Sequence, residues 1–100
     1  MSAYNIVRMR VKPGEVDGFL DIHRSRRFSD MPGMTALRVV RTGERDFCIL
    51  GEWTGMDALA AARPAMIDIL DSFRDKLEDL GGGLGVTDPV SGEAVIERHA

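Results

Sequence analysis

The run FCILGEWT, residues 47–54, constrains the fold most, because it has the composition of a strand and is apolar on both faces. Side chains alternate between the two faces of a strand. One face carries Phe47, Ile49 and Trp53, and the other carries Cys48 and Leu50. A strand that is apolar on both sides needs cover on both sides. We therefore expect this strand to lie inside a sheet that is covered on its two faces.

Periodicity and turn residues predict the elements around this strand. Residues 4–12 alternate between apolar and polar side chains, which predicts a strand, and a helix is expected over about 15–28. Residues 35–42 predict a second strand, which the short polar turn 43–46 joins to the two-sided strand as an antiparallel hairpin.

A long helical region is expected over 56–80, with a kink or a restart at Pro64 because proline lacks a backbone donor. The glycine-rich run 81–85 should end this helix. The last strand is expected over 93–98, after a turn at Asp88-Pro89 or at Ser91-Gly92.

The order strand, helix, strand, strand, helix, strand is the split βαβ arrangement of ferredoxin-like proteins. It predicts an α+β fold: a single domain over residues 1–100 with an antiparallel sheet and two helices on one face. The other face of the sheet then needs cover, which a second copy of the chain can supply. We therefore expect a homodimer that forms through the sheet faces and the last strand.

Composition excludes several classes of function. The formal net charge of −3 argues against binding to nucleic acid, which requires a basic surface. No apolar run is long enough to cross a membrane or to act as a signal sequence, and the single cysteine, Cys48, forms no internal disulfide. We expect a cytoplasmic protein.

The first predicted helix carries two polar residues on its apolar side. At about 100° per residue, His23 and Arg27 fall in the same arc as Val16, Phe19 and Leu20. One interpretation is structural: His23 bonds a carbonyl, and Arg27 reaches solvent at the helix end. The other is that both residues line a pocket.

Two further polar side chains are expected in the same space between helices and sheet. Asn5 is the only amide on the apolar face of the first strand, and Trp53 ends the third strand with an indole donor that needs a partner if buried. Each also has a structural interpretation, as a strand-end hydrogen bond or as plain core.

Four segments together resemble a known family: NIVRMRVKPG, MPG after the first helix, EWTGMDAL, and the ending VTDPVSGEAVIER. They are similar to the antibiotic biosynthesis monooxygenase family of dimeric α+β barrels. The resemblance implies a ferredoxin-like protomer, a homodimer and a pocket between the helices and the sheet. Members include oxygenases that act on polycyclic aromatic phenols or quinols without metal or flavin, and relatives that degrade haem.

The resemblance also implies roles for individual residues. Asn5 and Trp53 match an asparagine and a tryptophan implicated in oxygen chemistry, and His23 is a third catalytic candidate, as a general base or as a group that favours the substrate anion. The candidates for substrate contact are Arg27, Met9 and Met66. No cofactor and no metal site are expected, since the histidines show no ligand spacing.

The haem-degrading relatives carry a histidine ligand early in the second helix, where this chain has Arg63 or a neighbour of it. Arginine stays protonated and is not an ordinary iron ligand. The expected function is therefore a cofactor-independent monooxygenase of a small aromatic phenolic or quinol-type substrate. The alternatives are a dimeric binding protein for a hydrophobic metabolite, and an isomerase, decarboxylating or haem-degrading relative on the same scaffold.

Overall fold

The two-sided strand lies inside the sheet, as its pattern predicts. In the computed structural model, which describes residues 1–100, β3 (Asp46–Trp53) is flanked by β1 (Ala3–Val11) and β2 (Met34–Arg41), and both pairings are antiparallel. Along β3 the exposure alternates, and Phe47, Ile49 and Trp53 are all buried. The hairpin between β2 and β3 is thus confirmed.

Two short strands share the other edge of β1. β4 (Leu77–Glu78) pairs with the end of β1 at Arg10 and Val11, and β5 (Asp88–Glu93) pairs with its first part, from Ala3 to Arg8. Each pairing is antiparallel, so the sheet is four strands wide and its fourth position is divided in two. The fold is the predicted α+β ferredoxin-like protomer.

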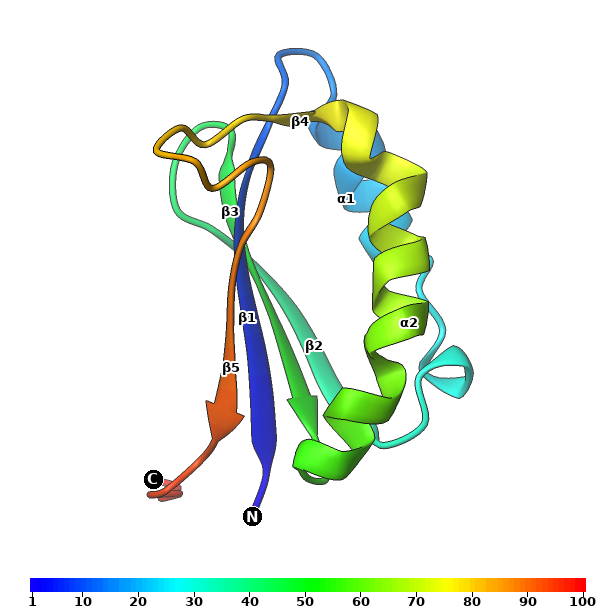
Figure 1. The fold of residues 1–100 in the computed structure, drawn as a ribbon, viewed down its shortest axis with the longest axis vertical. Helices are drawn as coiled ribbons and strands as arrows, with labels where there is room; N and C mark the ends of the chain where they lie inside the picture. Colours follow the sequence, from blue (N-terminus) through cyan, green and yellow to red (C-terminus); the bar gives the residue numbers. More distant parts are fainter.

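Both helices cover the same face of this sheet (Figure 1). α1 (Val16–Arg24) and the long α2 (Met56–Phe73) lie together on one side, and no helix lies on the other. The core between the layers consists of two clusters of buried residues. One contains Met9, Val11, Phe19, Phe47, Ile49, Phe73 and Leu77, and the other contains Ala3, Met31, Trp53, Leu59 and Ala62.

The face of the sheet away from the helices carries an apolar strip. The register places Leu50, Ile6 and Val90 side by side across β3, β1 and β5. Ile6 and Val90 are exposed, although polar groups around them are paired: Arg8 with Asp88 at 3.3 Å, Arg10 with Asp46 at 2.8 Å, and the Tyr4 hydroxyl with Glu52 at 2.6 Å. Arg38, opposite Leu50 on β2, forms no ion pair, so this face combines uncovered apolar side chains with charges that are mostly paired.

The first helix is shorter than the sequence predicts. It ends at Arg24 rather than near residue 28, and a separate 3-10 turn occupies Phe28–Asp30. Arg27 has an extended backbone, with φ −105° and ψ 130°. The helical arc that predicted an inward direction for Arg27 therefore does not apply to it, whereas it does apply to His23, which is buried.

The second helix ends at Phe73, seven residues before the predicted end. A 3-10 turn at Arg74–Lys76 follows, and Leu77 then pairs with Val11 in the sheet, where its side chain is buried. The position of Leu77 fits the apolar repeat of a helix and also fits a core position in the sheet. Its pairing with β1 determines that it belongs to the sheet. Pro64 lies within α2, which continues through it without restarting.

The prediction of the last strand was wrong in position. β5 covers Asp88–Glu93, the segment expected to form the turn, and residues 94–100 lie outside any strand. A strand at the edge of a sheet tolerates Pro89 and Gly92, because a missing donor can face solvent there. Val95 and Ile96 are 81% and 77% exposed, and the C-terminal segment leaves the body of the protein (Figure 1). No helix is both long and apolar enough to cross a membrane.

Candidate functional site

A cavity of about 500 Å³ lies between the helices and the inner face of the sheet. This volume falls within the roughly 300–1,000 Å³ of pockets that hold small organic ligands. Aliphatic, methionine and phenylalanine side chains from β1, β2, β3 and α2 form most of its wall, and β5 closes one side. Its polar lining residues are Asn5, His23, Arg26, Arg63, Thr87 and Ser91. No aspartate or glutamate lines it.

Asn5 and Trp53 form a hydrogen-bonded pair beside this cavity. The Trp53 indole Nε1 donates to Asn5 Oδ1 at 2.7 Å. Trp53 is fully buried and does not line the cavity, whereas Asn5 does. Because an indole nitrogen only donates, it fixes which amide atom is the oxygen. The Asn5 Nδ2 group makes no hydrogen bond within the protein, so its two donors are available to a ligand.

Gly51 makes this pair possible. It lies opposite Asn5 in the register between β1 and β3 and lines the cavity. A Cβ atom at this position would overlap Asn5 Oδ1 and approach Trp53 Nε1 to 3.0 Å. A glycine within a strand often marks such a close approach. Any larger residue would force the amide and the indole apart.

His23 lies in an aromatic cluster at another part of the cavity wall. Its ring centroid is 4.7 Å from that of Phe19 and 5.1 Å from that of Phe73, in both cases edge to face. The side chain is 6% exposed. Burial, together with the charge of Arg26, lowers the pKa of His23 from 6.5 to about 4. The imidazole is therefore neutral at neutral pH.

Arg26 fixes the tautomer of this imidazole. Arg26 Nη1 lies 3.4 Å from His23 Nδ1, and a guanidinium only donates, so Nδ1 accepts and the ring proton is on Nε2. His23 Nε2 and Arg26 Nε are both buried without a hydrogen-bond partner. Burial also lowers the pKa of the Arg26 guanidinium from its ordinary value, although arginine remains charged.

Arg63 is the second cation of the cavity and projects from α2. Its Nη2 donates to Ser91 Oγ at 3.3 Å, which links α2 to β5. Arg63 is exposed, so it stands at the rim. Arg63 offers no ligand to a haem iron, because arginine stays protonated. Nowhere do three or more His, Cys, Asp or Glu side chains group as metal ligands would.

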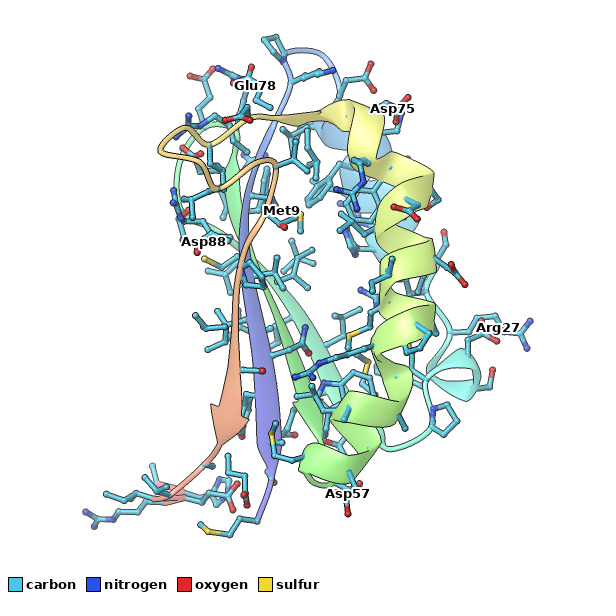
Figure 2. All side chains as sticks on the ribbon, in the orientation of Figure 1. Met9, Arg27, Asp57, Asp75, Glu78 and Asp88 are labelled. Carbon is cyan, nitrogen blue, oxygen red and sulfur yellow. The ribbon has the colours of Figure 1, made fainter.

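The cavity brings together most of the predicted site residues. Asn5, Met9, Met66 and His23 line it, and Trp53 supports Asn5 from behind. Figure 2 shows Met9 directed into the space between the sheet and α2. Arg27 is the exception: it is exposed, lies outside the lining and points away from the sheet (Figure 2). The early end of α1 is the reason for that error.

Sequence reasoning missed Arg26 and Gly51 as parts of the site. Arg26 lies one residue before the predicted Arg27, and no pattern in the sequence shows that the helix stops at Arg24. Gly51 carries a weak signal, since a glycine between apolar strand residues suggests close approach of another group.

Comparison with known proteins identifies the family. The profile of the antibiotic biosynthesis monooxygenases matches residues 2–65. The chain belongs to this family. No curated protein matches the sequence. Among solved structures, the cofactor-independent oxygenase SnoaB of Streptomyces nogalater is similar with a TM-score of 0.68 and 14% identity, over 96% of this chain and 95% of that one.

Two other solved structures of similar shape have no activity in their names. Rv0793 of Mycobacterium tuberculosis has a TM-score of 0.75 and 10% identity, over 99% of this chain and 100% of its own. A protein of unknown function from Nitrosomonas europaea has a TM-score of 0.71 and 15% identity, over 99% and 94%. At such identities the likeness shows the fold alone. The family includes cofactor-independent oxygenases and proteins of unknown function, so membership alone does not assign an activity to this chain.

Proposed function

We propose that this family member is a cofactor-independent monooxygenase of a small aromatic phenol or quinol, with the Asn5–Trp53 pair as its oxygen site. One observation carries the proposal: the indole N–H holds Asn5 Oδ1 at 2.7 Å and leaves both donors of the amide nitrogen for the cavity. A fixed donor facing an apolar space can stabilise negative charge on a phenolate or a peroxide as it develops.

Such a reaction needs no external reductant. An ionised phenol with a CH₂ group in the adjoining ring, as in an anthrone, transfers its electrons to O₂. One oxygen atom replaces the two hydrogens as a carbonyl, and the other leaves as water. The four electrons that O₂ takes up all come from the substrate. The protein then has to bind and orient the ring and stabilise the phenolate and peroxide anions. Its own side chains are sufficient for these roles.

The charge of Arg63 supports ionisation of the substrate. Arg63 donates to Ser91, which lies opposite Asn5, and no carboxylate lines the cavity, so a phenolate is favoured there over a neutral phenol. His23, with its pKa lowered to about 4 and its Nδ1 directed at Arg26, is a weak general base. In this proposal His23 is a hydrogen-bond donor through Nε2, and bulk solvent takes the phenolic proton.

Oxygen uptake tests the proposal. Purified protein without added metal or flavin is assayed against anthrones, naphthols and catechols. Asn5→Ala removes the donor and is expected to lower uptake about 100-fold. Trp53→Phe frees the amide to rotate and should cost about 10-fold, because a precisely held donor is worth more than a mobile one.

Ser91→Ala is the matched control, since Ser91 lines the same cavity but its side chain makes no hydrogen bond to Asn5 or Trp53. It should retain most of the uptake. Unchanged turnover in both Asn5→Ala and Trp53→Phe would contradict the assigned roles. If no compound of the panel is consumed, the second candidate, a binding protein for a hydrophobic metabolite, gains weight, because the same apolar cavity serves that function.

The working form in this proposal is a homodimer formed by the outer sheet faces. Ile6 and Val90 of the strip are exposed in the protomer, and two of its charged neighbours, Arg8 and Arg10, are already paired. Such a face suits a second copy of itself, because a two-fold interface brings the same strip together from both chains.

A further inference from the structure

The cavity contains two arginines and no acidic residue to balance them. We propose that its ligand carries a second group with a permanent negative charge, such as a carboxylate or a sulfonate, which Arg26 and His23 bind at the end of the cavity remote from Asn5. This inference rests on the proposed function, since it specifies the class of ligand that the same cavity takes.

Arg26 is the first support, because its charge is uncompensated. None of the ion pairs of the protein includes it, and its Nε is buried without a hydrogen-bond partner. The only polar contact of its half-buried side chain is with the neutral His23 ring. Withdrawing a charge from water, even in part, is unfavourable without a partner, so buried charges are normally paired. An anionic ligand would supply the missing partner.

His23 is the second support. It is 6% exposed, lines the cavity, and has a buried Nε2 without a partner. The contact of Nδ1 with the Arg26 guanidinium places the ring proton on Nε2, so the unpartnered atom is a donor. Unpaired buried donors are rare in folded proteins, and each calls for an acceptor. Two such donors on neighbouring side chains, one of them charged, suit an anion that the side chains turn to meet, since both atoms are covered in the protein without a ligand.

The positions along β1 separate this anion site from the oxygen site. Asn5 is near the start of β1, whereas Met9 belongs to the core cluster that contains the His23 neighbours Phe19 and Phe73. Four residues of strand span about 13 Å. The wall between the two ends is apolar, from residues such as Val7, Ile49 and Leu70. The cavity therefore suits an elongated apolar ring system with a reactive hydroxyl at one end and an acid at the other.

Arg63 is less suited than Arg26 to bind the anionic group of the ligand. It is exposed, it already donates to Ser91, and solvent screens its charge. Its partner Ser91 lies opposite Asn5 in the register, so Arg63 stands at the Asn5 end of the cavity, whereas the proposed anion site of Arg26 and His23 is at the other end.

The test compares two fluorescent probes that differ by one charged group. These are 8-anilinonaphthalene-1-sulfonate and N-phenyl-1-naphthylamine, the same molecule without the sulfonate. We expect the wild-type protein to bind the sulfonate about 10- to 100-fold more tightly, the range of a charge-assisted hydrogen bond. Arg26→Met should abolish this preference and leave binding of the neutral probe unchanged.

Arg27→Met is the matched control, because it removes the same charge one residue away and outside the cavity. It should keep the preference. Arg26→Lys restores the charge without the planar fork and should recover part of it. His23→Phe keeps the aromatic packing, removes the Nε2 donor and should weaken binding of the sulfonate several-fold. Thermal unfolding of each variant establishes that it is folded.

The outcomes separate this inference from the proposed function. Equal affinity of the wild type for both probes would overturn the anion site and leave the cavity as a binding site. A preference that survives Arg26→Met but disappears in Arg63→Met would overturn the assignment to Arg26. Equal loss of both probes in Arg26→Met would mean a structural role only. Failure of the wild type to bind either probe would overturn the ligand cavity itself, and with it the proposed function.

Discussion

Two side chains, His23 and Arg26, carry a feature that is unfavourable for stability. Both hold a buried donor without a partner, and the pKa of each is lowered by burial. A buried, unsatisfied polar group costs about 1–3 kcal/mol. Proteins keep such groups where binding or catalysis needs them, at the expense of stability. The wild-type protein should therefore be less stable without its ligand than a variant in which the donor is removed.

His23→Phe tests this at the level of one residue. The unfolded chain takes up a proton at His23 near pH 6.5, whereas the folded chain does so near pH 4. Between these values the unfolded state binds more protons, so the free energy of unfolding falls as the pH is lowered. Between pH 7 and pH 5 this group should cost the wild type about 2 kcal/mol that the variant does not lose.

Urea unfolding at the two pH values measures the difference. At pH 7 the variant should also be more stable than the wild type by about 1–3 kcal/mol, because the unpaired donor is gone. His99→Phe is the control, since His99 is exposed in the C-terminal segment, and it should keep the wild-type pH dependence. A slope with pH that is the same in His23→Phe and in the wild type would show that His23 does not carry the penalty.

At the level of elements, β1 and β3 hold the Asn5–Trp53 pair together. Their register places Asn5 opposite Gly51, and Trp53 lies two residues further along β3. The alternation of side chains turns all three to the inner face of the sheet. The geometry of the pair therefore depends on the pairing of two central strands, which are among the most rigid parts of a protein, and on the absence of a side chain at Gly51.

Gly51→Ala should separate the amide from the indole. The new methyl group would occupy the space of Asn5 Oδ1, so a side chain or the backbone has to move, at a cost of about 1–3 kcal/mol. Trp53 is the sole tryptophan, so its fluorescence reports directly on the loss of the hydrogen bond. We expect a shifted emission maximum and a lower urea midpoint.

Gly92→Ala in β5 is the matched control, because a Cβ atom there would meet nothing within 4 Å. Its emission and urea midpoint should stay close to those of the wild type. If Gly51→Ala behaves like Gly92→Ala on both measurements, the close approach at Gly51 does not determine the position of the pair.

The sequence predicts those elements whose pattern is contained within one segment of the chain. The alternation in β1 and the two-sided pattern of β3 are local, and both strands occur where the pattern places them. The ends of α2 and the place of β5 depend on which segment pairs with β1, and a pattern of one segment does not contain that information. Arg26 illustrates the effect on the site: an arc drawn for an uninterrupted helix selects Arg27, and the early end of α1 turns its neighbour inward instead.

On the scale of the whole molecule, one face of the sheet is covered and the other is exposed. The helices cover the inner face of the sheet (Figure 1). The outer face exposes Ile6, Val40 and Val90. The C-terminal segment adds Val95 and Ile96, which have no cover within the protomer. Contiguous apolar surface of this kind is typical of an interface between chains. The expected interface therefore comprises the outer sheet face and the C-terminal segment.

Two substitutions test this interface by sedimentation. Val90→Glu places a charge on the sheet face, and Val95→Glu places one in the C-terminal segment. Each should convert the dimer into monomers, because an unpaired charge in an interface is strongly unfavourable. Phe28→Glu is the control, since Phe28 is equally apolar and exposed but lies on the helical side. A stable dimer in both Val90→Glu and Val95→Glu would contradict the proposed interface.

The late position of β5 in the chain affects when the cavity is enclosed during folding. β5 closes one side of the cavity, yet its partner β1 lies some 85 residues earlier in the chain, with Arg8 opposite Asp88 and Ala3 opposite Glu93. Contacts between such distant segments carry the largest loop-closure cost and contribute to slow folding. The hairpin of β2 and β3 can form from local contacts alone. The pair of Asn5 and Trp53 closes a loop of 48 residues, shorter than the loop closed by β5 and β1, so its loop-closure cost is smaller and we expect it to form before β5 encloses the cavity.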